Sequence, residues 1–319
     1  MQAYEKLEIA FGEFVENENV VVCSSGSAAL HLAMETLRAV CGKKDYDACV
    51  IPSLTMVSCY RAVELAGYGV GLSDVDNVNG LIPQIEPGSF ETTVMPVHLY
   101  GRQAPTAHPG LTVIEDMAEA PGLSPNPNSY AACWSFYRNK IIAGEEGGAV
   151  AFKDSLSASV ARRLRCCGFD DAHTFDHMPR GMNYRMSNVH AELIYGSLAR
   201  YPYNIERRRE VEAMYDDHMP KHVVLGKRDQ PWVYDIHVGS KKAAGAVAYL
   251  RQNGVEARHY FKPMDQQSWF PGDRKKCRVS SMLHSSRLYL PIDPEMTESE
   301  VKLSSRLVTE FCESVDVPA

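Results

Sequence analysis

The chain has 319 residues, of which 45% are hydrophobic and 23% charged, and its 33 Lys and Arg against 40 Asp and Glu give a net charge of −7. This ordinary globular composition excludes disordered and collagen-like proteins, and the length favours a large domain with a smaller one. The acidic balance argues against nucleic-acid binding, and no apolar run approaches the roughly 20 residues that a membrane helix needs.

The cysteines, the histidines and the N-terminus bear on disulfide bonds, metal binding and cellular location. The nine cysteines are odd in number, form no CxxC, and lie mostly in apolar runs such as DYDACVIP, which is typical of buried reduced thiols. The eleven histidines are scattered without an HExxH pattern, so we predict no metal site. The charged, amphipathic N-terminus does not resemble a signal peptide. We therefore expect a cytoplasmic protein without a membrane anchor.

Helix-like and strand-like segments alternate through the first part of the chain. Helical patterns cover residues 4–15, 27–40 and 56–67. The strand-like segments are ENVVVC, CVIPS, VGLSDVD, TVMPVHLYG, LTVIEDMAEA, AACWSFYR and GGAVAF. Strand, loop and helix repeated in this way predict an α/β domain, with a mostly parallel sheet covered by helices, over residues 1–199.

The second part of the chain is more helical and predicts a small α/β domain over residues 200–319. A helical pattern covers residues 187–219 with a break near Tyr201 and Pro202. It is followed by strand-like WVYDIHV, helix-like KKAAGAVAYLRQNG, strand-like VEARHYF and helix-like TESEVKLSSRLVTEFCES. Thr297 and Glu300 form a capping-box pattern at the start of the last helix.

Two segments at the ends of predicted strands carry unusual polar residues, and ligands gather at this edge of a parallel sheet. The small residues from Cys23 to Ala29 come at the start of a helix, where free N–H groups can bind a phosphate; simple steric packing is the alternative. Asp116 ends an apolar strand, and Glu119 follows three residues later. A buried carboxylate needs a partner such as a protonated pyridine nitrogen, although capping a helix is the alternative for Asp116.

A third segment places Lys140 at the end of a strand-like run, just before the Gly-rich GEEGG. A lysine whose amine is desolvated can have a lowered pKa and react with a carbonyl group. The alternative for a single lysine is a solvated surface charge.

Taken together, these segments resemble the DegT/StrS family of sugar aminotransferases, which use pyridoxal 5'-phosphate (PLP). The blocks that match, in order and over nearly the whole chain, are SSGSAALHLA, VIPSLTMVSCYRAVELAG, MPVHLYGR, VIEDMAEAPG, SFYRNKIIAGEEGGAV, GMNYRMSNVHAEL, VEARHYFKPM and LYLPIDPEMTESEV. The resemblance implies PLP-dependent transferase fold type I, as in aspartate aminotransferase. SFYRNK is most similar to perosamine-synthase-like members.

The resemblance also assigns roles to individual residues. Lys140 matches the lysine that bonds to the cofactor and shuttles protons, and Asp116 matches the carboxylate that pairs with the pyridine nitrogen. Glu119 matches a position, often Gln, near the ring 3-hydroxyl group.

Further matches concern the phosphate of the cofactor. Gly26, Ser27 and Ser135 match its binding cradle. Asn183 matches an asparagine that reaches the phosphate from the partner subunit, which implies a homodimer with shared active sites.

The chain departs from the family pattern in several places. Met56 stands where the family usually stacks an aromatic residue on the PLP ring. Ala143 and Gly144 replace a common Thr-Thr pair. The chain begins at the family's first long helix, without the segment that usually precedes it, and the interval between Tyr100 and Val113 is too short for the usual helix. These departures predict a reduced version of the fold with intact cofactor chemistry, and they leave substrate recognition open.

The leading hypothesis is therefore amino transfer, with glutamate as donor, to a keto-sugar carried on a nucleotide. A second hypothesis keeps PLP but changes the reaction to decarboxylation, isomerisation or amination of a non-sugar or macromolecule-attached group. Lys140 argues against the dehydratase branch, in which histidine replaces the lysine. A third hypothesis is a non-catalytic PLP-binding protein, against which Lys140, Asp116 and Ser135 all speak.

Overall fold

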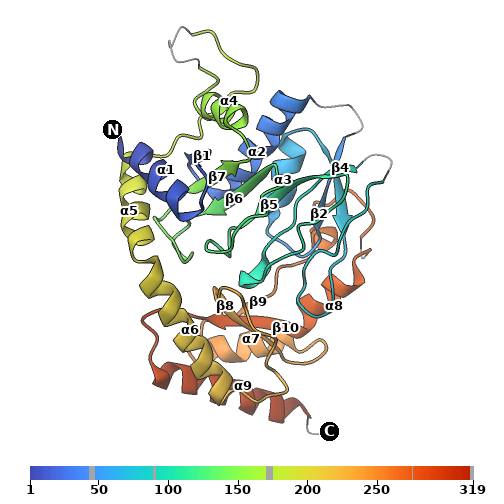
Figure 1. The fold of residues 1–319 in the computed structure, drawn as a ribbon. Helices are drawn as coiled ribbons and strands as arrows, with labels where there is room; N and C mark the ends of the chain where they lie inside the picture. The colour runs from blue at the N-terminus through green and yellow to red at the C-terminus, as the bar shows by residue number, and fades with distance from the viewer. Residues whose placement is uncertain (43–46, 89–90, 170–174, 275, 317–319) are drawn as a thin grey trace.

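Two sheets of different size organise the molecule (Figure 1). The structure is a computed structural model that describes residues 1–42, 47–88, 91–169, 175–274 and 276–316. The larger sheet and its helices form one layer system, and the smaller sheet lies beyond one edge of it with the C-terminal helices. Two consecutive helices, α5 (Asn188–Ala199) and α6 (Tyr201–His218), run from one part to the other.

The larger sheet has seven strands in the order β1-β7-β6-β5-β4-β2-β3. In chain order they are β1 (Val20–Cys23), β2 (Ala48–Pro52), β3 (Gly69–Ser73), β4 (Glu91–Val94), β5 (Thr112–Asp116), β6 (Ala131–Ser135) and β7 (Gly148–Phe152). β7 is antiparallel to both β1 and β6, and the other pairs are parallel. The prediction of a mostly parallel α/β sheet is therefore confirmed.

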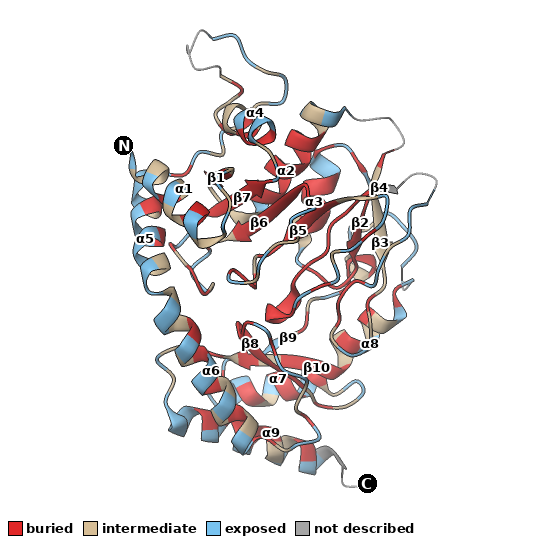
Figure 2. Ribbon diagram, viewed as in Figure 1, coloured by how far each residue is buried: buried red, intermediate tan, exposed pale blue. Residues whose placement is uncertain are grey.

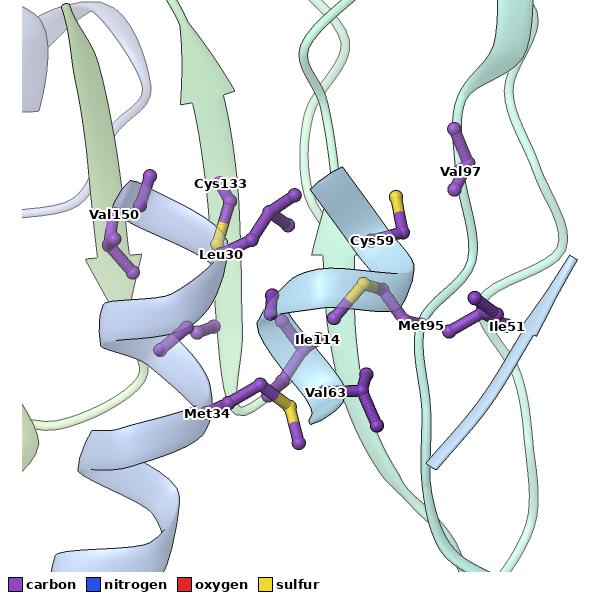
Figure 3. Packing of buried hydrophobic residues seen from close by; sticks show 14 of the residues in the cluster. Leu30, Met34, Ile51, Cys59, Val63, Met95, Val97, Ile114, Cys133 and Val150 are labelled. Carbon is purple, nitrogen blue, oxygen red and sulfur yellow. The ribbon is translucent and has the colours of Figure 1, made fainter. Parts of the chain in front are cut away.

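Helices cover both faces of this sheet and bury most of its strands, whereas the edge strand β3 is only partly buried. One face packs on α2 (Gly26–Cys41), α3 (Val57–Leu65) and α4 (Ser155–Arg165), and the other on α1 (Ala3–Phe14) and α5. Along β6, Cys133 faces the first group and Trp134 the second, as the alternation of a strand requires. Figure 3 shows the core of the first face, and Figure 2 shows burial concentrated on the strands and on the helix faces turned toward them.

The smaller sheet has three antiparallel strands in the order β8-β10-β9. Its strands are β8 (Val233–His237), β9 (Arg258–His259) and β10 (Arg287–Pro291), and the surrounding helices are α7 (Ala243–Gln252), α8 (Arg278–Ser286) and α9 (Glu298–Asp316). Two short 3-10 turns are Leu99–Gly101 and Met264–Gln266. The predicted strand VEARHYF forms only over Arg258–His259, because this edge strand pairs with just two residues of β10.

A buried ion cluster joins the two sheets. Arg102, which follows β4, donates from Nη1 and Nη2 to the carboxylate of Asp235 in β8, at 3.0 and 2.9 Å. Burial alone would raise the pKa of Asp235, but the guanidinium groups of Arg228 and Arg102 hold it well below its ordinary value. These charged hydrogen bonds set the small sheet against the carboxyl edge of the large one.

Several other predictions can be compared with the structure. The break near Tyr201 is confirmed at Arg200, and Thr297 and Glu300 form the capping box, with the Thr297 N–H 2.8 Å from Glu300 Oε2. Between β4 and β5, the only helical element among the described residues is the 3-10 turn at Leu99–Gly101, as the short interval predicted. The division into domains at residues 199 and 200 stays a prediction.

Most of the cysteines are buried, as predicted, but Cys41 is exposed and Cys166 and Cys167 are partly exposed. All nine lie in described residues, none forms a disulfide, and six of them are buried. In the described part of the chain, no helix is both long and apolar enough to cross a bilayer. No cluster of three or more potential ligands for a metal occurs there either. The cytoplasmic location stays a prediction.

Candidate active site

A cavity of about 450 Å³ lies at the carboxyl edge of the large sheet. Its walls come from the ends of β5 and β6, the N-termini of α2 and α3, and the C-terminal part of the chain. The residues that line it include Ser25, Gly26, Ser27, Thr55, Met56, Ser58, Asp116, Ala118, Glu119, Ser135, Lys140, Trp232, Arg258, Phe261 and Tyr289. Seven of the eight predicted site residues are among them.

One end of the cavity is built to bind an anion. Ser25 caps α2, and its Oγ accepts from the Ala28 N–H at 3.1 Å, so the positive end of the helix faces the cavity. A side chain at Gly26 would place its Cβ only 2.6 Å from the Cβ of Ser135, so only glycine permits this close approach. The Ser27 and Ser58 hydroxyl oxygens lie 2.6 Å apart beside it. N–H groups and hydroxyl groups thus converge where a phosphate would fit.

Asp116 is the last residue of β5 and forms part of the cavity wall. Only 5% of it is exposed. Its Oδ1 accepts from the Ala118 N–H at 3.0 Å, and its Oδ2 accepts from the Cys59 S–H at 3.1 Å. The alternative reading of Asp116 as a helix cap is wrong, because a loop leads from β5 to β6 and no helix starts there.

Lys140 and Glu119 face each other inside the cavity. Lys140 Nζ lies 3.8 Å from Glu119 Oε1 and 3.9 Å from the centre of the Trp232 ring. The other carboxylate oxygen of Glu119 accepts from the Tyr100 N–H at 2.7 Å. Trp232 Nε1 donates to the carbonyl of Asn139 at 2.8 Å, which fixes the turn that carries the lysine. Lys140 is therefore not a solvated surface charge.

Burial shifts the pKa values of both Lys140 and Glu119. Burial lowers the pKa of Lys140, and the carboxylates of Glu119 and Asp116 oppose this change. Burial raises the pKa of Glu119 to about 7, although the charge of Lys140 and the Tyr100 N–H act in the opposite direction. A lysine with a lowered pKa has more of the neutral amine that attacks a carbonyl carbon.

Met56 lies on the rim of the cavity, at the N-cap of α3. Its side chain is free to contact a bound group, because the residue is 51% exposed.

Asn183 is the one predicted site residue outside the cavity of its own chain. It is exposed, pairs with Cys166 in an isolated bridge, and accepts from Arg185 Nε at 3.0 Å. Its predicted role in the cavity of a partner subunit stays a prediction.

Several residues of the site were not singled out in the sequence. Trp232, Arg258, Phe261 and Tyr289 reach the cavity from the C-terminal part of the chain. Trp232 had a usable signal, since it is one of only three tryptophans and is the first residue of a predicted strand. Cys59 had none, because nothing distinguishes it from the other cysteines in apolar runs.

The donor set fits a group that carries a phosphate, a reactive carbonyl and a basic ring nitrogen. The helix end with Gly26, Ser27 and Ser135 suits the phosphate, Lys140 suits the carbonyl, and Asp116 suits a protonated nitrogen. These three chemistries meet in one cavity, and PLP carries all three groups.

Comparisons with known proteins agree with this geometry. A model of the DegT/DnrJ/EryC1/StrS aminotransferase family matches residues 2–306. The chain is 30% identical over 287 residues to the GDP-perosamine synthase of Caulobacter vibrioides, which covers 81% of this chain and 76% of that protein.

Solved structures show the same fold. Helicobacter pylori PseC, an aminotransferase involved in the biosynthesis of pseudoaminic acid, superposes with a TM-score of 0.90 at 18% identity, covering 98% of this chain and 92% of that one. NtdA from Bacillus subtilis, solved with bound PMP as cofactor, superposes with a TM-score of 0.87 at 20% identity, covering 98% and 78%.

Proposed function

The chain belongs to the DegT/DnrJ/EryC1/StrS aminotransferase family, and we propose that it transfers an amino group from glutamate to a keto-sugar linked to a nucleotide. The protein is a PLP-dependent aminotransferase of fold type I, as the sequence predicted. The observation that carries the proposal is the buried Lys140 amine, which faces Glu119 in the same cavity as Asp116. The proposal concerns the identity of the amino donor and of the amino acceptor.

Each residue has a proposed task. Bound PLP supplies an electron sink for the carbon that carries the amino group. Lys140 would hold the cofactor through its amine, and the same amine would be the group that moves a proton between carbon and nitrogen. Asp116 holds a proton at the ring nitrogen, and the helix end at Gly26 and Ser27 binds the phosphate.

The outer wall of the cavity carries a positively charged residue that suits an anionic substrate. Arg258 reaches it from β9 with its side chain 48% exposed, and its Nε also donates to Glu256 Oε1 at 3.1 Å. A guanidinium group there suits the carboxylates of glutamate and the diphosphate of a nucleotide-linked sugar.

Incubating the PLP-loaded protein with glutamate alone tests whether glutamate is the amino donor. In the protein loaded with PLP, glutamate without any acceptor should remove the visible absorbance of the lysine-bound cofactor, and 2-oxoglutarate should restore it. A PLP enzyme with another reaction, or a non-catalytic PLP-binding protein, would keep its spectrum under the same conditions. An unchanged spectrum with glutamate would contradict the proposed donor.

Glu119→Gln should shift the pH at which Lys140 reacts with the cofactor. The Glu119 carboxylate raises the pKa of Lys140, so removing its charge should lower that pKa further. More neutral amine is then present at low pH, and the midpoint of the pH profile for PLP uptake by the apoprotein should move to lower pH. Glu146→Gln, at an exposed residue of the same cavity, is the matched control. A midpoint that does not move would show that the two side chains are not coupled.

Met56→Phe should bind PLP more tightly. An aromatic face stacked on the ring is worth about 0.5–1.5 kcal/mol beyond simple burial, which corresponds to at most about tenfold in affinity. Titrating PLP into both apoproteins measures this change, and Leu65→Phe at the exposed far end of α3 is the control. Lower turnover with unchanged affinity would instead mean that Met56 makes room for the substrate. If neither quantity changes, Met56 does not face the ring.

We also propose a homodimer with shared active sites, from the exposed position of Asn183 and its match to the family. Mixing inactive Lys140→Ala and Asn183→Ala chains should then restore part of the activity, because one site of each heterodimer contains neither lesion. Mixing Lys140→Ala with Asp116→Asn is the control and should restore nothing, since both residues line the cavity of one chain. A fully active monomer in sedimentation would exclude the shared site.

A further inference from the structure

The thiol of Cys59 lies against the carboxylate of Asp116. Cys59 belongs to the first turn of α3 and is completely buried in the core of the large sheet. Its S–H donates to Asp116 Oδ2 at 3.1 Å, across 57 residues of sequence. Figure 3 shows the Cys59 sulfur directed away from Val63 of the same helix.

A second hydrogen bond fixes the direction of the thiol. Thr55 Oγ1 lies 3.2 Å from Cys59 Sγ. Because the single thiol proton is given to Asp116, the Thr55 hydroxyl is the donor to the sulfur. The result is a directed chain from Thr55 through Cys59 to Asp116, in which each hydrogen bond strengthens the next.

Cys59 remains a thiol in this environment. Burial raises its pKa well above the ordinary value, and the neighbouring Asp116 carboxylate raises it further. A thiol is a hydrogen-bond donor, whereas a thiolate would repel the carboxylate. Burial and Asp116 therefore both favour the neutral thiol, which is the form that donates in this contact.

The two protein donors to Asp116 determine which way its carboxylate points. A carboxylate has about four lone-pair sites, and the protein occupies one on each oxygen, through the Ala118 N–H and the Cys59 S–H. The remaining sites are available to the cavity that Asp116 lines.

We propose that Cys59 is a positioning residue for the amino-transfer reaction, whose S–H group holds the Asp116 carboxylate turned toward the ring nitrogen of the cofactor. This inference rests on the proposed role of Asp116. Without the Cys59 S–H group, the Asp116 carboxylate is free to rotate away from the ring nitrogen. The ring nitrogen is then less protonated. A hydroxyl group in place of the thiol keeps the donor.

The test uses full-length apoprotein loaded with PLP that is labelled with ¹⁵N in the ring. The ¹⁵N chemical shift reports protonation of the ring nitrogen, and the rate of reaction with glutamate is measured in parallel. Cys59→Ala should move the resonance toward that of the unprotonated ring and slow the reaction about tenfold, or ~1.4 kcal/mol. Cys59→Ser should restore both. Cys49→Ala is the matched control, because Cys49 is equally buried and its thiol lies by the Val50 carbonyl instead.

Asp116→Asn is measured in the same series to separate the two claims. If Asp116→Asn moves the resonance and Cys59→Ala does not, the positioning role of Cys59 is wrong and the proposed function stands. If Asp116→Asn leaves the resonance unchanged, the proposed role of Asp116 itself fails. Should Cys59→Ala not fold, Cys59→Val fills the space without a donor, and a wild-type resonance in that variant would overturn the inference.

Discussion

Lys140→Ala should abolish amino transfer while the protein stays folded. No other described lysine lines the cavity, so the variant loses both the covalent attachment of the cofactor and the group that moves the proton. Loss of general acid–base catalysis alone costs about 10²–10⁴-fold in rate. The loss of covalent attachment adds to this, so turnover should fall below detection in an assay of product formation.

Folding of this variant can be measured separately. Lys140 is buried with its amine desolvated, so the alanine removes a costly charge. It also removes the charge that lowers the pKa of Glu119, so this buried carboxyl group can take up a proton and become neutral. The thermal midpoint should therefore stay near that of the wild-type apoprotein. Lys153→Ala, at an exposed lysine after β7, is the matched control and should keep full activity. Full turnover of Lys140→Ala without an added amine would disprove the assignment.

Asp116→Asn should slow proton abstraction by several orders of magnitude. The amide keeps the size of the side chain but removes the charge that stabilises a protonated ring nitrogen, which weakens the electron sink. The rate of the half-reaction with glutamate, followed by stopped-flow absorbance, measures the change. Asp154→Asn is the control, because Asp154 caps α4 far from this chemistry and asparagine caps a helix equally well. A loss of less than about tenfold, or ~1.4 kcal/mol, would mean that another group pairs with the ring.

The pattern of the sequence predicted most of the large sheet, for a simple reason. Strands buried on both faces are continuous apolar runs, and the helices between them carry Ala and Leu, so both periods are visible. α4 was not predicted, although its buried residues Ala158, Ala161 and Leu164 follow helical spacing. The direction of β7 could not be predicted either, because a short connection such as that between β6 and β7 does not reveal how two strands pair.

The site was predictable only in part. Asp116 was visible because a charged residue at the end of an apolar strand is unusual. Lys140 was visible because it follows a strand-like segment and precedes a Gly-rich turn, although the strand itself ends earlier, at Ser135. The resemblance to the family placed Glu119 and Ser135 with them. Their supporting contacts come from segments far away in the sequence. Cys59 meets Asp116 across 57 residues, and Trp232 meets Asn139 across 93. No local sequence pattern predicts such a contact, because it forms only when the chain folds.

The most direct test of the proposed function is a panel of nucleotide-linked keto-sugars incubated with the PLP-loaded protein and glutamate, with products read by mass spectrometry. We predict that at least one keto-sugar gains the mass difference between an amine and a ketone, with 2-oxoglutarate formed in equal amount. The product should be absent with Lys140→Ala or without glutamate. If glutamate converts the bound cofactor but no keto-sugar in the panel, nor an unlinked sugar control, is aminated, the acceptor is not a nucleotide-linked keto-sugar and the proposed function is contradicted.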